Sequence, residues 1–162
     1  MNGTMLCLAL LASGMPRAEK ACKYTDMVVE EAEKNNIDPV IYASLLYVES
    51  RWKTNAHGRS DECGMSQIVP EYYPKLKLSC RQLKKPHNAI AAGAKVLGYW
   101  VNVYGKGNYK IGLCGYNVGY RCKGRNKYKR GFRYAKHVNK WASKIIKALE
   151  ESAFVTITVE GE

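Results

Sequence analysis

The spacing of apolar residues along most of the chain predicts helices joined by polar turns. A first helix is expected over residues 25–34, with Thr25 able to cap its start. A second is expected over residues 39–49, because Asp38 supplies an N-cap carboxylate and Pro39 suits the first helical position. Apolar side chains three and four positions apart give this second helix one buried stripe: Ile41, Tyr42, Leu45, Leu46 and Val48.

Two longer helices and one strand are predicted farther along the chain. Residues 88–104 keep the helical apolar spacing between Pro86 and Gly105, and they are expected to form the central core helix. Residues 132–149 combine one apolar face with lysines around the rest of the helix. Residues 154–160 are rich in β-branched side chains and predict a short strand.

The segment from Arg51 to Ser79 shows little periodicity and contains several glycines and prolines. It predicts long loops, with a short β-hairpin as an option, and loops of this length in a small domain are usually functional. The expected fold class is therefore mainly α. A chain of 162 residues accommodates one domain, placed over residues 22–150, with a C-terminal tail over residues 151–162.

An apolar run from Met5 to Met15 precedes this domain. A helix of about eleven residues is too short to cross a hydrocarbon core of roughly 30 Å. Small residues follow the run, as a signal-peptide cleavage site requires, but no Lys or Arg precedes it. Residues 1–18 are therefore expected to be a signal peptide or, alternatively, an apolar N-terminal arm packed on the domain.

The chain contains six cysteines: Cys7, Cys22, Cys63, Cys80, Cys114 and Cys122. Removal of a signal peptide would take Cys7 with it and leave five, so one thiol would be unpaired. Two disulfides are then expected among the remaining five in an oxidising compartment, with the pairing left open. No metal or other cofactor is expected, because none of the three histidines lies at ligand spacing from a CxxC pair.

The charge balance is strongly basic, with 26 Lys and Arg against 14 Asp and Glu and a formal net charge of +12. Such a surface favours an anionic partner, but screened attraction does not distinguish nucleic acid from anionic lipid or wall polymers. The run from Arg121 to Arg133 mixes basic and aromatic residues, which is compatible with single-stranded nucleic acid or, as we favour, with a solvated loop.

The most specific pattern starts at Glu49-Ser50, continues through Trp52 and Ala56, and ends in the heptapeptide 64–70 (GMSQIVP). It resembles the soluble lytic transglycosylase family, glycoside hydrolase family 23. That family runs from a Glu-Ser pair through an aromatic residue and an alanine to Gly-Leu-Met-Gln, two aliphatic residues and proline. The spacing agrees without a gap, and several matched positions at fixed separation are more specific than one dipeptide.

Two later motifs extend the resemblance to about residues 24–145. The pentapeptide 115–119 (GYNVG) is similar to the family's Ala-Tyr-Asn-Ala-Gly motif, and 134–138 (YAKHV) to its Tyr-Val-x-x-Val motif. The chain departs from the pattern at Met65-Ser66, at Gly58 where many members have serine, and at Asp61-Glu62 where many have Gly-Ala.

The resemblance implies a lysozyme-like helical domain with a substrate groove and with Glu49 as its single catalytic carboxyl group. Cleavage of a glycosidic bond needs a proton on the leaving oxygen, so the donor must stay protonated near neutral pH. Glu49 is expected at a helix C-terminus beside Trp52, Tyr116 and Tyr134, where both the helix dipole and desolvation raise a carboxyl pKa.

The resemblance also assigns a set of substrate-binding residues: Ser50, Gln67, Tyr116, Asn117 and Tyr134. Tyr134 is implied as the phenol that orients Glu49, and the others as groups that line the sugar groove. Ser50 is expected to support the local backbone or the substrate rather than to act as a nucleophile, since no motif pairs it with a base.

A second carboxylate would distinguish hydrolysis from transglycosylation. Goose-type lysozymes share the fold and the glutamate but carry aspartates that position water, one of them where this chain has Val69. The resemblance therefore favours a transglycosylase, in which the substrate's own N-acetyl group stabilises the cation and the C6 hydroxyl closes a 1,6-anhydro ring. Asp61 and Glu62 keep hydrolysis open, although both are expected to be surface charges of the loop.

The expected function is thus that of a peptidoglycan lytic transglycosylase that cleaves the MurNAc–GlcNAc bond. The alternatives are a goose-type-like hydrolase or a catalytically weak wall-binding component of a secretion or phage apparatus. The expected partners are peptidoglycan strands and an anionic cell-wall or outer-membrane surface, without specific nucleic acid. The protein is expected to be monomeric and either exported to the periplasm or outside the cell, or part of a phage virion or lysis system.

Overall fold

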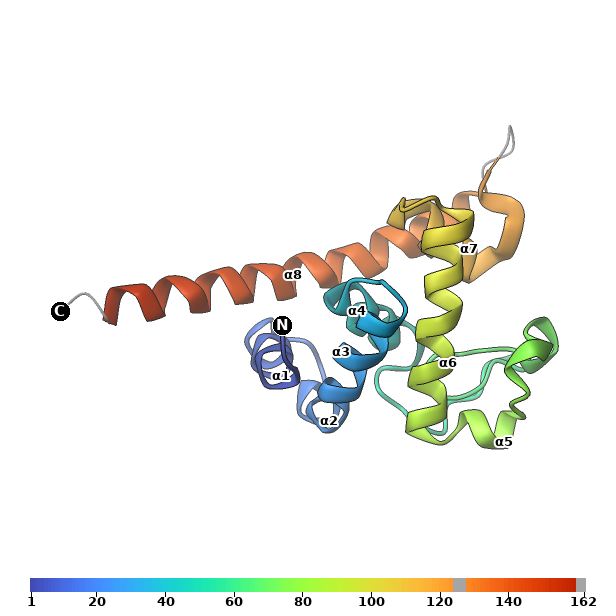
Figure 1. The fold of residues 1–162 in the computed structure, drawn as a ribbon, viewed down its shortest axis with the longest axis horizontal. Coiled ribbons are helices and arrows are strands. Elements are labelled where there is room, and N and C mark those ends of the chain that lie inside the picture. The colour runs from blue at the N-terminus through green and yellow to red at the C-terminus, as the bar shows by residue number, and fades with distance from the viewer. Residues whose placement is uncertain (124–127, 160–162) are drawn as a thin grey trace.

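The computed structural model describes residues 1–123 and 128–159, with side chains described as far as residue 152. In these segments the chain forms helices joined by turns and loops (Figure 1). The longer ones are α1 (Gly3–Ala12), α3 (Thr25–Lys34), α4 (Pro39–Ser50), α6 (Pro86–Gly98), α7 (Tyr109–Val118) and α8 (Lys129–Val159). Short elements connect them: α2 (Ala18–Ala21), η1 (Cys22–Tyr24), η2 (Pro70–Tyr72), η3 (Pro74–Leu76), α5 (Cys80–Leu83), η4 (Tyr99–Tyr104) and η5 (Gly119–Cys122). The mainly α fold class is confirmed.

The start of α4 follows the sequence expectation. Asp38 accepts hydrogen bonds from the backbone N–H groups of Val40 and Ile41, and Pro39 occupies the first helical position. Thr25 differs, because it is the first residue of α3 rather than its cap, and its hydroxyl donates to the carbonyl of Cys22. The side chains of α4 face the core on nearly every side, so this helix is enclosed by its neighbours.

The predicted core helix over residues 88–104 appears as α6 followed directly by the π-helical turn η4. Helix α7 was not predicted. Its apolar pattern is interrupted by Gly112 and Gly115, which are buried where a Cβ would come within 3.0 Å of Val101 and Trp100. The two glycines therefore allow α7 to pack closely on the end of the core helix, a tertiary reason that helical periodicity does not reveal.

Helix α8 is much longer than the predicted 132–149 and projects beyond the rest of the molecule (Figure 1). The prediction of a strand over residues 154–160 is wrong for the part that the structure describes, since α8 continues to Val159. No Gly or Pro lies between Gly131 and this point. Extension of an existing helix costs only a few tenths of a kcal/mol per β-branched residue, whereas a new strand would need a partner.

Residues 1–18 form part of the packed structure. Helix α1 contacts α3 and α8, and the side chains of Leu6 and Leu10 are fully buried in the main core. This is the arrangement of the apolar arm that the sequence left as the alternative to a signal peptide. None of the helices in the described residues is both long and apolar enough to cross a membrane.

The cysteines form three disulfides: Cys7–Cys22, Cys63–Cys80 and Cys114–Cys122. The expectation of two bonds and one unpaired thiol applied to a chain without residues 1–18; with α1 present, Cys7 pairs with Cys22 and all six cysteines are bonded. Each bond closes a short loop of the chain, and such cross-links stabilise mainly by restricting the unfolded ensemble.

The long loop between α4 and α5 has two isolated β-bridges, His57 with Cys63 and Cys63 with Ile68, in place of a regular hairpin. The Cys63–Cys80 disulfide joins this loop to the start of α5. At Gly64 the backbone has φ +70, and a Cβ would meet the carbonyl of Leu83 at 1.8 Å. The loop is thus held tightly against the segment that precedes α6.

Candidate active site

Glu49 is the last residue but one of α4, and the chain turns sharply just after it. Arg51 and Trp52 both have positive φ angles, 52° and 62°, and the N–H of Arg51 donates to the carbonyl of Tyr47. Two consecutive non-glycine residues in the left-handed region are unusual and mark a backbone that its surroundings hold in place. This turn ends α4 two residues after the catalytic carboxyl group.

The carboxyl group of Glu49 lies in a largely dry setting with one strong partner. Burial raises its pKa from 4.5 to about 7, the hydroxyl of Tyr134 lowers it by donating a hydrogen bond, and the charge of Glu62 raises it further. The Tyr134 Oη to Glu49 Oε1 distance is 2.5 Å. Glu49 as a whole residue keeps part of its surface exposed. A carboxyl group with this pKa is substantially protonated at neutral pH.

Two tyrosines from different helices complete the surroundings of Glu49. Tyr134 comes from α8 and Tyr116 from α7, and the pKa of each phenol is raised, first by burial and then by the charge of Glu49. Tyr116 does not bond to the carboxyl group; its hydroxyl donates to the carbonyl of Ser66 at 2.7 Å. Helices α4, α7 and α8 and the long loop therefore converge on one carboxyl group.

Two buried side-chain oxygens in the described residues have no hydrogen-bond partner, Asn117 Oδ1 and Ser66 Oγ. Asn117 follows Tyr116 on α7, and Ser66 is the residue whose carbonyl Tyr116 binds. A buried acceptor without a partner costs roughly 1–3 kcal/mol, so such groups are commonly satisfied by a ligand or water. Sequence reasoning missed Ser66, whose departure from the family motif was visible but had no assigned role.

The other predicted substrate-binding residues differ in how they are placed. Gln67 is partly exposed with φ +51, and its amide donates to the carbonyl of Gly64 at 2.9 Å. Ser50 is buried, and its hydroxyl donates to the carbonyl of Leu46 within α4. Of the two roles expected for Ser50, the structure favours support of the backbone over contact with substrate.

Trp52 is also placed differently from the expectation that it walls Glu49. Its side chain is buried, and its indole N–H donates to the sulfur of Met15 at 3.5 Å. The aromatic residue of the motif therefore packs the end of α4 against the N-terminal segment.

The loop that departs from the family motif brings one acidic residue toward Glu49. Glu62 is partly buried and accepts a hydrogen bond from the N–H of Ser60 at 2.9 Å. A Cβ at Gly58 would lie 2.0 Å from Glu62 Oε2, so the glycine makes room for this carboxylate. Gly58 and Glu62, which both differ from the family motif, thus form one structural feature. A comparison of the motif position by position could not indicate this.

No such electrostatic effect on Glu49 is seen for Asp61 or Val69. The side chain of Asp61 is exposed and lies 3.6 Å from His57, while Val69 is buried. The structure therefore agrees with a surface role for Asp61 but gives Glu62 an electrostatic effect on the site.

One group of potential metal ligands lies outside this site. His57, Cys63 and Cys80 offer atoms within 4.8 Å of one another. Both sulfurs, however, are joined in a disulfide, so they provide no thiolate for a metal ion. The chemistry at Glu49 can be supplied by side chains alone.

The site can therefore donate a proton from one carboxyl group and accept it back, with a tyrosine fixing that group's orientation. The fold and site define a lysozyme-like helical domain built around a single glutamic acid of raised pKa. A family model described as the transglycosylase SLT domain matches residues 26–139, and the chain belongs to this family.

A solved structure shows the same fold. It is that of an inactive mutant of the lytic transglycosylase Slt from Pseudomonas aeruginosa, with a TM-score of 0.65 and 19% sequence identity. The match covers 88% of this chain and 30% of the other, so this chain spans less than a third of that protein.

Proposed function

We propose that this protein is a peptidoglycan lytic transglycosylase that cleaves the β-1,4 bond between N-acetylmuramic acid and N-acetylglucosamine. The observation that carries the proposal is a carboxyl group with a pKa of about 7, hydrogen-bonded to Tyr134 and set at the edge of the loop that bears the family motif. Such a group can act as an acid at neutral pH without the help of a metal ion.

In the first step Glu49 donates its proton to the glycosidic oxygen as the bond to C1 of the muramic acid breaks. The substrate's N-acetyl group stabilises the positive charge that develops at C1. In the second step the Glu49 carboxylate removes the proton of the C6 hydroxyl, and O6 bonds to C1 to form the 1,6-anhydro ring. The carboxyl group is thereby restored, and no water is consumed.

The substrate groove is proposed to include Gln67, Tyr116 and Asn117. Asn117 Oδ1 is the acceptor that lacks a protein partner, which suits it to bind an acetamido N–H or a hydroxyl group of the sugar. Tyr116 presents an aromatic ring held in place by its bond to Ser66. Export to the periplasm or the outside of the cell, or a phage lysis role, is part of the proposal, because three disulfides suit an oxidising compartment.

Product analysis tests the proposal. Purified protein acting on isolated sacculi should release muropeptides with 1,6-anhydro ends, identified by mass spectrometry, and Glu49→Gln should abolish their release. Reducing ends alone would replace transglycosylation with hydrolysis and would direct attention to Glu62. Wall binding without turnover in the parent protein would instead support a catalytically weak binding role.

A further inference from the structure

The positive charge of this protein is concentrated in one part of the chain. Residues 72–149 hold 19 of the 26 Lys and Arg residues and none of the 14 Asp and Glu residues. The earlier part of the chain, which includes Glu49 and Glu62, carries more acidic than basic residues. The net charge of +12 is thus a property of the region from η3 to α8, and not of the catalytic loop.

On α8 these cations form a continuous exposed stripe. Its members recur three or four positions apart, and all of them are exposed: Lys129, Arg133, Lys136, Lys140, Lys144 and Lys147. At 1.5 Å per residue the cationic stripe is about 27 Å long. Among the described residues, Lys147 is the one member with a carboxylate partner, Glu151 at 3.6 Å.

At its N-terminal end the stripe enters a cavity of about 820 Å³ between α7 and α8. The lining residues are Lys110, Lys129, Phe132, Arg133, Lys136 and Asn139. Neither α7 nor α8 has an acidic residue in its first turn. The cations at the start of α8 lie beside the positive end of the helix dipole, which lowers the stability of the helix. Their positive potential adds to that of the helix N-terminus and favours the binding of an anionic ligand.

The cavity end of the stripe lies on a different side of α8 from the residue that contacts the catalytic carboxyl group. Successive residues of a helix are turned by about 100°, which places Lys136 roughly 200° around α8 from Tyr134. Tyr134 points to Glu49, whereas Lys136 lines the cavity on the opposite side. A ligand in the cavity therefore leaves the side of α8 that faces Glu49 free.

We propose that the cationic stripe and its cavity bind a linear phosphodiester polymer of the bacterial envelope, which holds the enzyme beside its substrate. A row of exposed Lys and Arg side chains matches evenly spaced phosphates, and the fork of Arg133 can bind a phosphate with two hydrogen bonds. The proposal rests on the proposed function for the source of the polymer, but the binding surface does not depend on it.

Other anionic partners fit the stripe less well. Proteins that bind single-stranded nucleic acid usually offer successive exposed aromatic rings for base stacking, whereas the cavity contains one, the partly buried Phe132. An anionic membrane surface would favour apolar side chains beside the cations, and Ile146 is the one large exposed aliphatic side chain on the described part of α8.

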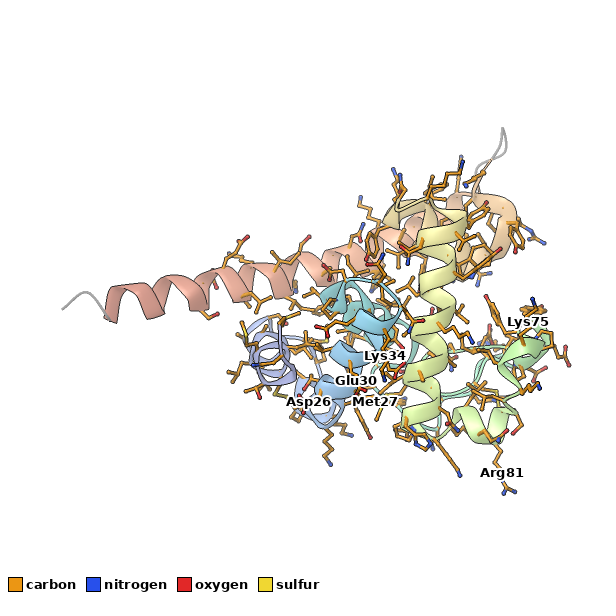
Figure 2. The ribbon with its side chains drawn as sticks, in the orientation of Figure 1. Asp26, Met27, Glu30, Lys34, Lys75 and Arg81 are labelled. Carbon is orange, nitrogen blue, oxygen red and sulfur yellow. A yellow bond between two sulfur atoms is a disulfide. The ribbon has the colours of Figure 1, made fainter. Side chains whose placement is uncertain are left out.

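A binding experiment with poly(glycerol phosphate) as the probe tests the proposal. The stripe variant carries Lys129→Gln, Arg133→Gln and Lys136→Gln. The matched control carries Lys75→Gln, Lys77→Gln and Arg81→Gln, which removes the same charge from exposed side chains in the segment around η3 and α5. Figure 2 shows two of them, Lys75 and Arg81. The stripe variant should bind at least about tenfold more weakly with a smaller salt dependence, and the control less than about threefold.

If the two variants lost the same amount of affinity for the polymer, binding would depend on net charge alone, and the proposed binding site would be wrong. The proposal would also be wrong if the parent protein bound other anionic ligands as tightly as poly(glycerol phosphate). The ligands to compare are single-stranded DNA with the same number of phosphates and phosphatidylglycerol vesicles. Glu49→Gln should bind the polymer like the parent. The binding readout involves no glycan, so it can fail while the product analysis succeeds, or the reverse.

Discussion

At the scale of single residues, the two partners of Glu49 act on its pKa in opposite directions. The hydroxyl of Tyr134 stabilises the carboxylate, and the negative charge of Glu62 disfavours it. The alkaline limb of a pH profile of kcat/KM reports the pKa of the essential acid in the free enzyme. The contributions of the two neighbours can therefore be separated by mutation.

We expect Tyr134→Phe to move the alkaline limb to higher pH and Glu62→Gln to move it to lower pH. Tyr134→Phe should also lower kcat by roughly tenfold, because the carboxyl group loses its orienting hydrogen bond. Glu62→Gln should leave kcat at the new optimum within about threefold of the parent. A loss of more than about a hundredfold on Glu62→Gln would instead indicate that Glu62 takes part in the chemistry as a base.

The raised pKa of Glu49 also makes the stability of the protein depend on pH. Between pH 4.5 and about 7 the folded state keeps a proton that the unfolded state releases, so stability falls as pH rises through this window. The full shift corresponds to about 3 kcal/mol, reached above pH 7.

Glu49→Gln removes this titration and keeps an amide oxygen that can accept the bond from Tyr134. We therefore expect the variant to be more stable than the parent at pH 8, by up to about 3 kcal/mol, and similar to it at pH 4. Urea denaturation at the two pH values measures the difference. An equal difference at both pH values would mean that folding does not raise the pKa of Glu49.

At the scale of secondary-structure elements, local patterns predicted α4 well because its start depends on neighbours in sequence. Asp38 and Pro39 act within one turn, and the apolar positions that follow leave few alternatives to a buried helix. Helix α7 was missed because its glycines serve a distant contact with Val101 and Trp100. The predicted strand failed because the state of residues 154–159 depends on the helix that precedes them.

The residues of the candidate site also fall into those that the sequence predicted and those that only the structure revealed. Motif spacing indicated Glu49 and Tyr134, which lie 85 residues apart and meet in a hydrogen bond. The role of Glu62 could not be read from spacing, because it depends on the space that Gly58 leaves in the folded loop. The vacant acceptor on Asn117 likewise became visible only when its surroundings were known.

At the scale of the whole molecule, the N-terminal segment, residues 1–18, is joined to the catalytic domain in three ways. Leu6 and Leu10 fill the main core, Cys7 is bonded to Cys22, and Met15 accepts the hydrogen bond of the Trp52 indole. The last of these contacts reaches the turn that ends α4 at the active site. Helix α1 is thus expected to fold and unfold with the domain.

Two leucines on α1 provide a matched test of this coupling. Leu10 is fully buried and Leu8 is 61% exposed, so the two positions differ in burial on one helix. Leu10→Ala should lower the free energy of unfolding by about 2–4 kcal/mol, because it leaves a cavity in the core, and Leu8→Ala by less than about 0.5 kcal/mol. Urea denaturation of the protein with its disulfides intact measures both. If both variants matched the parent, α1 would be detached from the domain in solution, and residues 1–18 would then fit the signal-peptide interpretation better than that of a packed arm.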